Sequence, residues 1–234
     1  MNYAALKQRQ RAERDHYHDN LGLRVHRALS WLNKAEQESD DDGAFVFLWI
    51  AFNAAYATDL SQCLHSSHGV GGLIDSAAAE AGASKVTESG RFHSFIDKLA
   101  GLDHDNRLYE LVWNDFADNI RLLLDNHYMF QPFWDVQSGR HPGRDWLSEF
   151  QAANHAARCA LGHKDTTGVI SIILSRIYTL RNQIIHGGAT YSSGVNRDQV
   201  RCGKRFLEGF VPIIVAIMMD HPETLWGDAS YPVV

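Results

Sequence analysis

Arg181, Asn182 and His186 are the residues of this chain whose types and spacing most favour a chemical function. They follow an aliphatic segment and precede two glycines, Gly187 and Gly188. A guanidinium holds a phosphate through paired hydrogen bonds, and an imidazole transfers protons near neutral pH. If the three side chains converge, they favour cleavage of a phosphodiester bond over any other reaction that the sequence suggests.

The residues before the motif predict that it ends a helix. Thr166 and Thr167 are the expected cap, and Gly187 suits the left-handed residue that ends a helix. The apolar positions recur at helical spacing: Ile170, Ile173, Leu174, Ile177, Leu180 and Ile184. At about 100° per residue, Arg181 falls near the middle of this apolar stripe, whereas Asn182 and His186 share one flank.

A guanidinium on an apolar stripe needs a phosphate, a cavity or a carboxylate to receive it. The sequence therefore leaves two interpretations of Arg181 open. In one, Arg181 belongs to a phosphate site. In the other, it forms a buried ion pair, and His186 only occupies the carboxyl end of the helix, where a protonated imidazole interacts favourably with the dipole.

Helical periodicity extends over most of the chain. The other predicted helices cover residues 24–37, 44–60, 105–127, 146–161 and 197–220. The helix after Asp40-Asp41-Asp42-Gly43 is apolar nearly all round, which predicts a central, buried position. Pro212 is expected to kink or divide the last helix. We therefore predict an all-α fold, an antiparallel bundle of five to seven helices.

The length of 234 residues fits a single domain covering residues 1–234. Residues 1–23 are predicted to form an N-terminal arm. Residues 61–104, which begin with a stretch rich in Ser, Gly and Ala, are predicted to be a loop-rich insertion with short helices near 74–81 and 91–100. Residues 128–146 gather proline and glycine among aromatic residues, which predicts an ordered connection.

The net charge of the chain limits the classes of partner that we expect it to bind. A formal net charge of −6 argues against a protein that coats nucleic acid without specificity. Arg201, Lys204 and Arg205 cluster after the motif, and they are either a local basic rim for RNA or a solvated helix face. Three cysteines without a Cys-x-x-Cys pattern suit a reducing compartment. With no evident secretory signal and no apolar run long enough to span a bilayer, we expect a soluble, cytoplasmic protein without membrane association.

Asn53 and three tryptophans are weaker candidates for a site. Asn53 lies in an apolar helix, where it either bonds a neighbouring helix or borders a cleft that binds the substrate. Trp113, Trp134 and Trp146 are able to stack on bases, although tryptophan in a helical protein usually belongs to the core.

Metal and cofactor sites are not expected. His16-x-His18 and His65-x-x-His68 have spacings that a metal can use, but neither has a nearby second pair with zinc geometry, and polar loop histidines are the better interpretation. The sequence contains no phosphate-binding glycine loop, no dinucleotide-binding glycine pattern and no nucleophile elbow.

The motif resembles the signature of a known family. Arg181-Asn182-x-x-x-His186 is similar to the Arg-x(4–6)-His motif of HEPN domains, in which an asparagine usually follows the arginine. The run from Phe47 to Tyr56, with Trp49, Phe52 and Asn53, resembles the buried early helix of a group of bacterial HEPN-like proteins. The resemblance covers residues 24–60 and 105–220, and the segment from residue 61 to about residue 103 has no counterpart in it.

This resemblance implies a fold and an activity. Many HEPN domains are metal-independent endoribonucleases of toxin–antitoxin and phage-defence systems, and they are typically homodimers whose two motifs share one cleft. Carried over, Arg181 would hold the scissile phosphate, His186 would act as general base or acid, and Asn182 would orient the histidine or bond a phosphate oxygen. The implied products are a 2′,3′-cyclic phosphate and a 5′-hydroxyl, the implied partners are RNA, a second copy and an antitoxin protein, and no cofactor is implied.

Other members of this family have lost catalysis. The main alternative is therefore a non-catalytic HEPN-like module that binds a nucleotide or a protein, which the acidic net charge favours. A helical scaffold with Arg181 in a buried ion pair is the third possibility. Geometry discriminates among them. An enzyme requires Arg181 and His186 to be accessible in one cleft, close to their copies across a two-fold axis, whereas a scaffold requires Arg181 to be sealed against a carboxylate.

Overall fold

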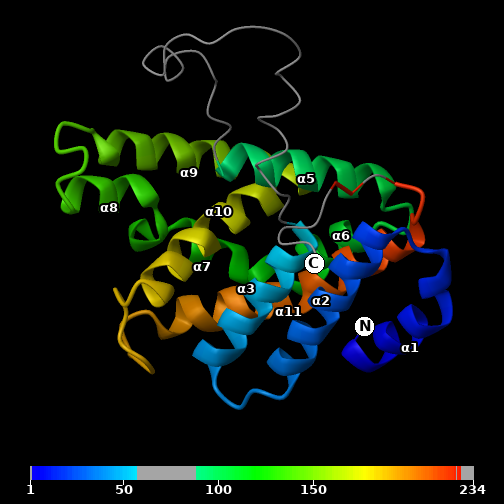
Figure 1. Cartoon of the computed structure of the whole chain (residues 1–234). Coiled ribbons are helices and arrows are strands. Elements are labelled where there is room, and N and C mark those ends of the chain that lie inside the picture. Colours follow the sequence, from blue (N-terminus) through cyan, green and yellow to red (C-terminus); the bar gives the residue numbers. More distant parts are fainter. Residues whose placement is uncertain (1, 57–87, 225, 228–234) are drawn as a thin grey trace, which may run out of the picture.

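The chain is helical throughout the part that the computed structural model describes, which is residues 2–56, 88–224 and 226–227. Figure 1 shows these helices, and no β-strand occurs among the described residues. The α-helices are α1 (Tyr3–Glu13), α2 (Asp19–Glu36), α3 (Asp41–Tyr56), α5 (Glu88–Leu102), α6 (Arg107–Glu110), α7 (Ile120–Leu124), α8 (Gln131–Gln137), α9 (Trp146–Gly162), α10 (Thr166–Ile185) and α11 (Arg197–Asp220). The predicted all-α class is confirmed, although these ten segments exceed the five to seven predicted. None of them combines the length and the apolar character that a membrane crossing requires.

The centre of the structure is α3, which packs between α2 and α11. Its apolar side chains, including Phe45, Leu48 and Phe52, are buried, as the sequence predicts. Gly203 of α11 lets three helices meet, because a Cβ at this position would lie 3.0 Å from Cε2 of Phe45 on α3 and 3.6 Å from Cγ1 of Ile177 on α10. The helix that ends in the motif, α10, therefore packs against α3 and α11 at this position.

The second side of α10 is covered by α5, which belongs to the core. Its buried residues Phe92, Ile96 and Leu99 face the bundle, and α5 and α10 are in contact over much of their length. The short helix predicted near residues 91–100 is confirmed as part of α5. Residues 88–102 are therefore helical rather than loop-rich within the predicted insertion over residues 61–104, and their apolar residues at helical spacing pack into the bundle. The predicted short helix near residues 74–81 and the His65-x-x-His68 pair lie outside the described residues.

Residues 2–23, in the segment predicted as an N-terminal arm, are largely helical. They contain α1, which buries Leu6 and Gln10, and the first turn of α2. An ion-pair group holds α1 to the far end of the bundle: Arg9 Nη1 lies 2.6 Å from Asp220 Oδ1 of α11, and Arg107 Nη2 donates to the other oxygen of the same carboxylate. Asp220 thus connects segments from the beginning, middle and end of the chain.

Residues 105–127, predicted as one long helix, are divided into short pieces. Between α6 and α7 lie a π-helical turn (Leu111–Asp115) and a 3-10 turn (Ala117–Asn119). The apolar residues of this region, such as Val112 and Ile120, are nevertheless buried. The helical spacing of the apolar residues therefore predicted correctly which of them are buried, but it did not predict that the helix is interrupted.

The helix ends follow local chemistry. Asp40 Oδ1 accepts a hydrogen bond from the backbone N–H of Gly43 and caps α3, as the sequence predicts. The cap of α10 is Asp165, whose side chain accepts from Gly168 N, rather than the predicted threonines. The last helix covers residues 197–220 as predicted, and Pro212 lies inside α11 without dividing it. In the predicted connection over residues 128–146, Pro132 stands in the first turn of α8, where a proline is favourable.

The Asp220 ion-pair group predicts an acid-sensitive contribution to stability. Burial raises the pKa of Asp220, but hydrogen bonds from Arg107 and Arg9 outweigh it, so the pKa lies below its usual value. Because the folded-state pKa is lower than the unfolded-state pKa, this stabilisation is present above about pH 4 and lost as the pH falls through the folded-state pKa. Asp220→Asn should lower the free energy of unfolding at pH 7 by about 1–3 kcal/mol, with a smaller loss at pH 3, measured by chemical denaturation.

Asp198→Asn is the matched control, because Asp198 is an exposed carboxylate of the same helix and lies 3.9 Å from Arg201 Nη1. Equal stability of the two variants at pH 7 would contradict the role assigned to Asp220.

Candidate functional site

The motif lies where α10 ends. The backbone N–H of His186 donates to Asn182 O at 3.1 Å, and Gly187 N donates to Ile184 O at 3.2 Å. Gly187 has a φ of +71°, which is the left-handed stop predicted from the sequence. Ala189 N then donates to Gln183 O at 3.0 Å and closes the turn. The chain therefore leaves the helix along a path defined by backbone hydrogen bonds directly after the motif.

Arg181 is held by Asn182 and not by a carboxylate. Its Nη1 donates to Asn182 Oδ1 at 2.9 Å. Its Nε is buried and has no hydrogen-bond partner among the described residues. No aspartate or glutamate among the described residues forms an ion pair with Arg181. The arrangement leaves a guanidinium with unused donors, which is the state that an incoming anion would complete.

A second unpartnered donor lies across from α10 on α3. Trp49 is 2% exposed, and within the described part of the chain its Nε1 has no hydrogen-bond partner, although a buried indole N–H usually finds one. The Trp49 ring lies 6.0 Å from the ring of Tyr178, which is one helical turn before Arg181 and Asn182. Asn53, half-buried, follows Trp49 by one turn of α3. The sequence analysis singled out Asn53 as a candidate site residue and not Trp49. The position of Trp49, one helical turn before Asn53, could have indicated it.

His186 lies apart from this group. It is exposed, and within the described part of the chain its imidazole makes no hydrogen bond. His186 follows Arg181 by five residues, so the two side chains leave the helix about 140° apart. A side-chain hydrogen bond joins Arg181 to Asn182. Among the described residues no side-chain hydrogen bond joins His186 to either of them, although the His186 backbone N–H donates to Asn182 O.

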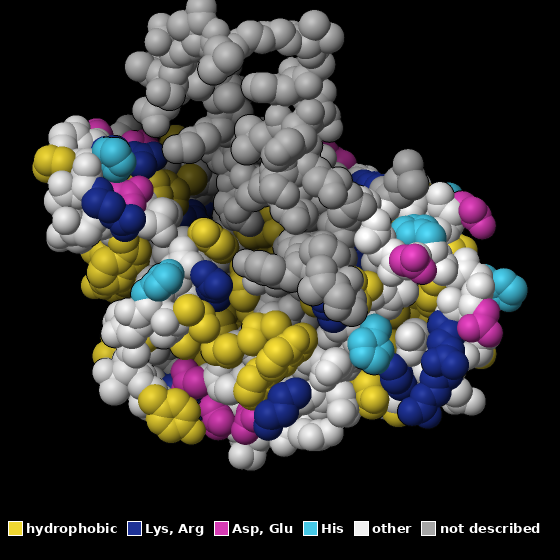
Figure 2. Space-filling view, viewed as in Figure 1, with side chains coloured by type: hydrophobic (Ala, Val, Ile, Leu, Met, Phe, Trp, Pro, Cys, Tyr) yellow, Lys and Arg dark blue, Asp and Glu magenta, His cyan; other side chains and the backbone are white. Residues whose placement is uncertain are grey.

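The basic cluster of α11 is largely neutralised. Arg201 Nε lies 3.1 Å from Asp41 Oδ2, and Lys204 Nζ lies 3.4 Å from Asp41 Oδ1 and 3.3 Å from Glu208 Oε1. Burial raises the pKa of Asp41, but hydrogen bonds from Arg201 and Lys204 outweigh it, and the pKa lies below its usual value. In the view of Figure 2, lysine and arginine are interspersed with acidic side chains rather than gathered over one continuous surface.

Arg205 faces a different neighbourhood from Arg201 and Lys204. It is exposed and lines a surface hollow beside the π-helical turn, together with Asp115 and Phe116 among others. The basic rim for RNA stays a prediction, and two of its three residues, Arg201 and Lys204, are paired with acidic side chains. Another hollow is formed by residues 140–144 in the α8–α9 connection, and Arg181 and His186 line neither of them.

Arg176 is a buried cation that the sequence analysis did not single out. It is 4% exposed, and its guanidinium carbon lies 4.6 Å from the ring centre of Phe130 and 5.3 Å from that of Phe150. Its Nη2 donates to Asn154 Oδ1 at 3.3 Å, and its Nε has no partner. Burial lowers the pKa of Arg176 to about 10, against the opposing charge of Asp125.

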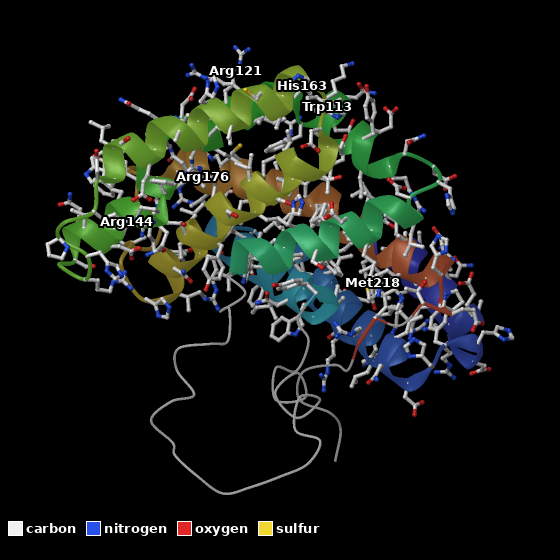
Figure 3. All side chains as sticks on the ribbon, turned by 90° about the horizontal axis from the view of Figure 1, so that it is seen from above. Trp113, Arg121, Arg144, His163, Arg176 and Met218 are labelled. Carbon is white, nitrogen blue, oxygen red and sulfur yellow. The ribbon has the colours of Figure 1, made fainter. Side chains whose placement is uncertain are left out.

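Arg176 connects α10 to the hairpin of α8 and α9. Figure 3 shows Arg176 on α10 and Arg144 farther out, at the connection between α8 and α9. Only Ala157 is buried in the 17 residues of α9, so little apolar burial holds this helix in place. The contacts of Arg176 with Phe150 and Asn154 therefore form a large part of what attaches α9 to the motif helix.

No family model, curated protein or solved structure to which the chain was compared matches it. Within the described residues, no group of three or more histidine, cysteine, aspartate or glutamate side chains could hold a metal ion.

The burial of Arg176 without a carboxylate predicts that its charge does not stabilise the fold. Arg176→Met keeps most of the contact with the two phenylalanine rings and removes a buried cation, so the free energy of unfolding should stay equal or rise by about 1–2 kcal/mol. Arg176→Ala leaves a cavity and should lower it by about 2–4 kcal/mol. Chemical denaturation at pH 7 measures both. A loss on Arg176→Met as large as on Arg176→Ala would mean that the charge itself stabilises the packing.

Proposed function

We propose that this protein is a metal-independent endoribonuclease of HEPN type. The observation that carries the proposal is the state of Arg181, a partly buried guanidinium on the motif helix that is oriented by an amide and has no carboxylate partner in the described residues. The interpretation in which Arg181 forms a buried ion pair would require a carboxylate there.

The chemistry follows from the residue types. Arg181 binds the scissile phosphate and stabilises the charge that develops on its oxygens. Asn182 accepts from Arg181 Nη1 and so orients the guanidinium. His186 removes the proton from the ribose 2′-hydroxyl, the 2′-oxygen attacks phosphorus, and the bond from phosphorus to the 5′-oxygen breaks. The 5′-oxygen takes up a proton, and the products are a 2′,3′-cyclic phosphate and a 5′-hydroxyl.

The separation of Arg181 and His186 around α10 favours a site shared by two subunits. With the side chains about 140° apart on one helix, a single copy presents them in different directions. A second copy, related by a two-fold axis, can supply its histidine to the arginine of the first. We therefore propose a homodimer with composite sites. A cytoplasmic role in toxin–antitoxin or phage defence, with an antitoxin protein as a further partner, belongs to the same proposal.

The alternative is a non-catalytic HEPN-like module that binds a nucleotide or a protein. Two observations favour it: the formal net charge is −6, and Asp41 neutralises Arg201 and Lys204. Such a module would use Arg181 to hold an anionic group without breaking a bond. The two proposals differ in whether His186 is required.

Cleavage of a labelled oligoribonucleotide in the presence of EDTA tests the activity. We expect wild-type protein to yield cyclic-phosphate ends, and Arg181→Ala and His186→Ala each to lower the rate at least about a hundredfold. His163→Ala is the matched control, because His163 is an exposed histidine at the carboxyl end of α9 as His186 is at the end of α10. Cleavage by all variants alike would point to a contaminating nuclease and reject the proposal, and no cleavage by wild type would favour the binding module.

Mixing the two inactive variants tests the shared site. A dimer of one Arg181→Ala chain and one His186→Ala chain retains one intact composite site, formed by the remaining arginine and the remaining histidine. We expect co-expressed, co-purified mixed dimers to recover cleavage that neither variant shows alone. A mixed dimer that stays inactive, although size-exclusion chromatography shows it to be dimeric, would place both residues of each site in the same subunit.

A further inference from the structure

Aromatic rings gather beside the motif helix. Tyr128 is in the short 3-10 helix η4 (His127–Met129), Phe133 and Trp134 are in α8, and Trp146 begins α9. Ring centres of Tyr128 and Phe133 lie 5.5 Å apart, those of Tyr128 and Trp134 lie 6.3 Å apart, and those of Phe133 and Trp146 lie 4.9 Å apart. We call Tyr128, Phe133, Trp134 and Trp146 the aromatic patch.

The aromatic patch is not part of the buried core. Tyr128 is 50% exposed, and Phe133, Trp134 and Trp146 are half-buried. In contrast, the core rings of Phe52 and Phe92 are fully buried. The patch therefore presents ring surface to solvent.

A hydrogen bond attaches the aromatic patch to the motif. Gln183, which directly follows Asn182, donates from Nε2 to the backbone carbonyl of Tyr128. Trp134 Nε1 donates to the same carbonyl at 2.7 Å. Gln183 precedes His186 by three residues, so the two side chains are neighbours on the surface of the helix. Tyr128 and Trp134 are thus held next to the side of α10 that carries His186.

Charge near the patch is balanced. Arg140 and Arg144, in the connection after α8, lie 3.2 Å and 3.3 Å from the carboxylate of Asp135, and Arg144 also pairs with Glu149 at 2.7 Å. A ligand that binds the patch therefore gains ring contact more than phosphate contact. Bases of single-stranded nucleic acid bind to protein rings in this way, whereas the bases of a duplex are stacked on one another and not available.

We propose that Tyr128 and Trp134 form a base-stacking subsite for single-stranded RNA beside the motif. This inference rests on the proposed function and adds to it the class of substrate, an unpaired RNA segment in which a base next to the reacting phosphate stacks on the ring of Tyr128. Gln183 is a positioning residue, because it fixes the Tyr128 backbone relative to the end of α10. Recognition through ring contact implies that this part of the binding energy depends little on salt.

Binding to a cleavage-silent protein tests the subsite separately from catalysis. In the His186→Ala background, fluorescence anisotropy gives the Kd of a labelled single-stranded oligoribonucleotide. Tyr128→Ala should raise the Kd about 5- to 100-fold, and the increase should be similar at low and high salt. Tyr128→Phe, which keeps the ring, should bind as the parent does. Trp31→Ala is the matched control, because Trp31 is a partly exposed ring on α2 and stacks on Phe47.

An oligonucleotide with abasic positions tests the same contact without altering Tyr128. The parent should bind it as weakly as Tyr128→Ala binds the intact strand, and Tyr128→Ala should weaken its binding no further. This arm does not depend on the folding of a variant. Equal affinity of the parent for intact and abasic strands would overturn the subsite, as would an equal loss of affinity on Trp31→Ala.

The outcome is distinguishable from failure of the ribonuclease proposal. If wild-type protein cleaves RNA while Tyr128→Ala changes neither Kd nor KM, the subsite is wrong and the activity stands. If wild-type protein does not cleave but Tyr128→Ala and abasic strands weaken binding as expected, the subsite stands in a binding module. If Tyr128→Ala weakens the binding of duplex and single-stranded RNA equally, the ring does not contact an unpaired base and the inference is rejected.

Discussion

A guanidinium on the inner side of α10, held by an amide and not by a carboxylate, is the constraint on which the interpretation of this structure depends. Arg181 is part of α10, and its buried Nε has no hydrogen-bond partner among the described residues. Its position is fixed because α10 is packed on several sides, by α5, by α9, and by α11 and α3 where Gly203 permits close approach. Rigid packing of this kind keeps a charged group oriented without an internal counter-ion, which is what preorganised binding of an anion requires.

The two arginines of α10, Arg176 and Arg181, have different surroundings. We relate the difference to two roles, attachment of the α8–α9 hairpin by Arg176 and binding of a ligand by Arg181. Arg176 lies over two phenylalanine rings and bonds Asn154, so its contacts are made with the α8–α9 hairpin. Arg181 bonds only its neighbour Asn182 among the described residues. A cation that packs on rings contributes to the arrangement of helices, whereas a cation with unused donors has capacity left for a ligand.

Local rules explain the parts of the fold that the sequence predicted well. The last helix, α9, α10 and the central helix were each predicted to within a few residues, because apolar spacing and cap residues act over a single turn. The left-handed Gly187 and the Asp40 cap followed from the same short-range chemistry. The predictions failed where the local preference of a segment competes with its packing against segments that are distant in the sequence. Residues 105–127 have the apolar spacing of one amphipathic helix. In the structure their apolar residues are buried by short helices joined by a π-helical turn and a 3-10 turn. Residues 88–102 were assigned to an insertion because of the polar stretch that precedes them, although their own apolar residues belong to the core.

The sequence by itself determined that the chain is helical and that an Arg-Asn-x-x-x-His motif stands at the end of a long helix with a glycine stop. Periodicity and caps are properties of neighbouring residues, so they are readable without a fold. Only the tertiary structure decided what surrounds that motif: the absence of a carboxylate against Arg181 in the described residues, the unpartnered indole of Trp49 and the neutralisation of Arg201 and Lys204 by Asp41. It also brought Tyr128 to Gln183 across 55 residues of sequence. Such contacts depend on how helices cross, and one sequence does not state which of its many polar side chains will meet.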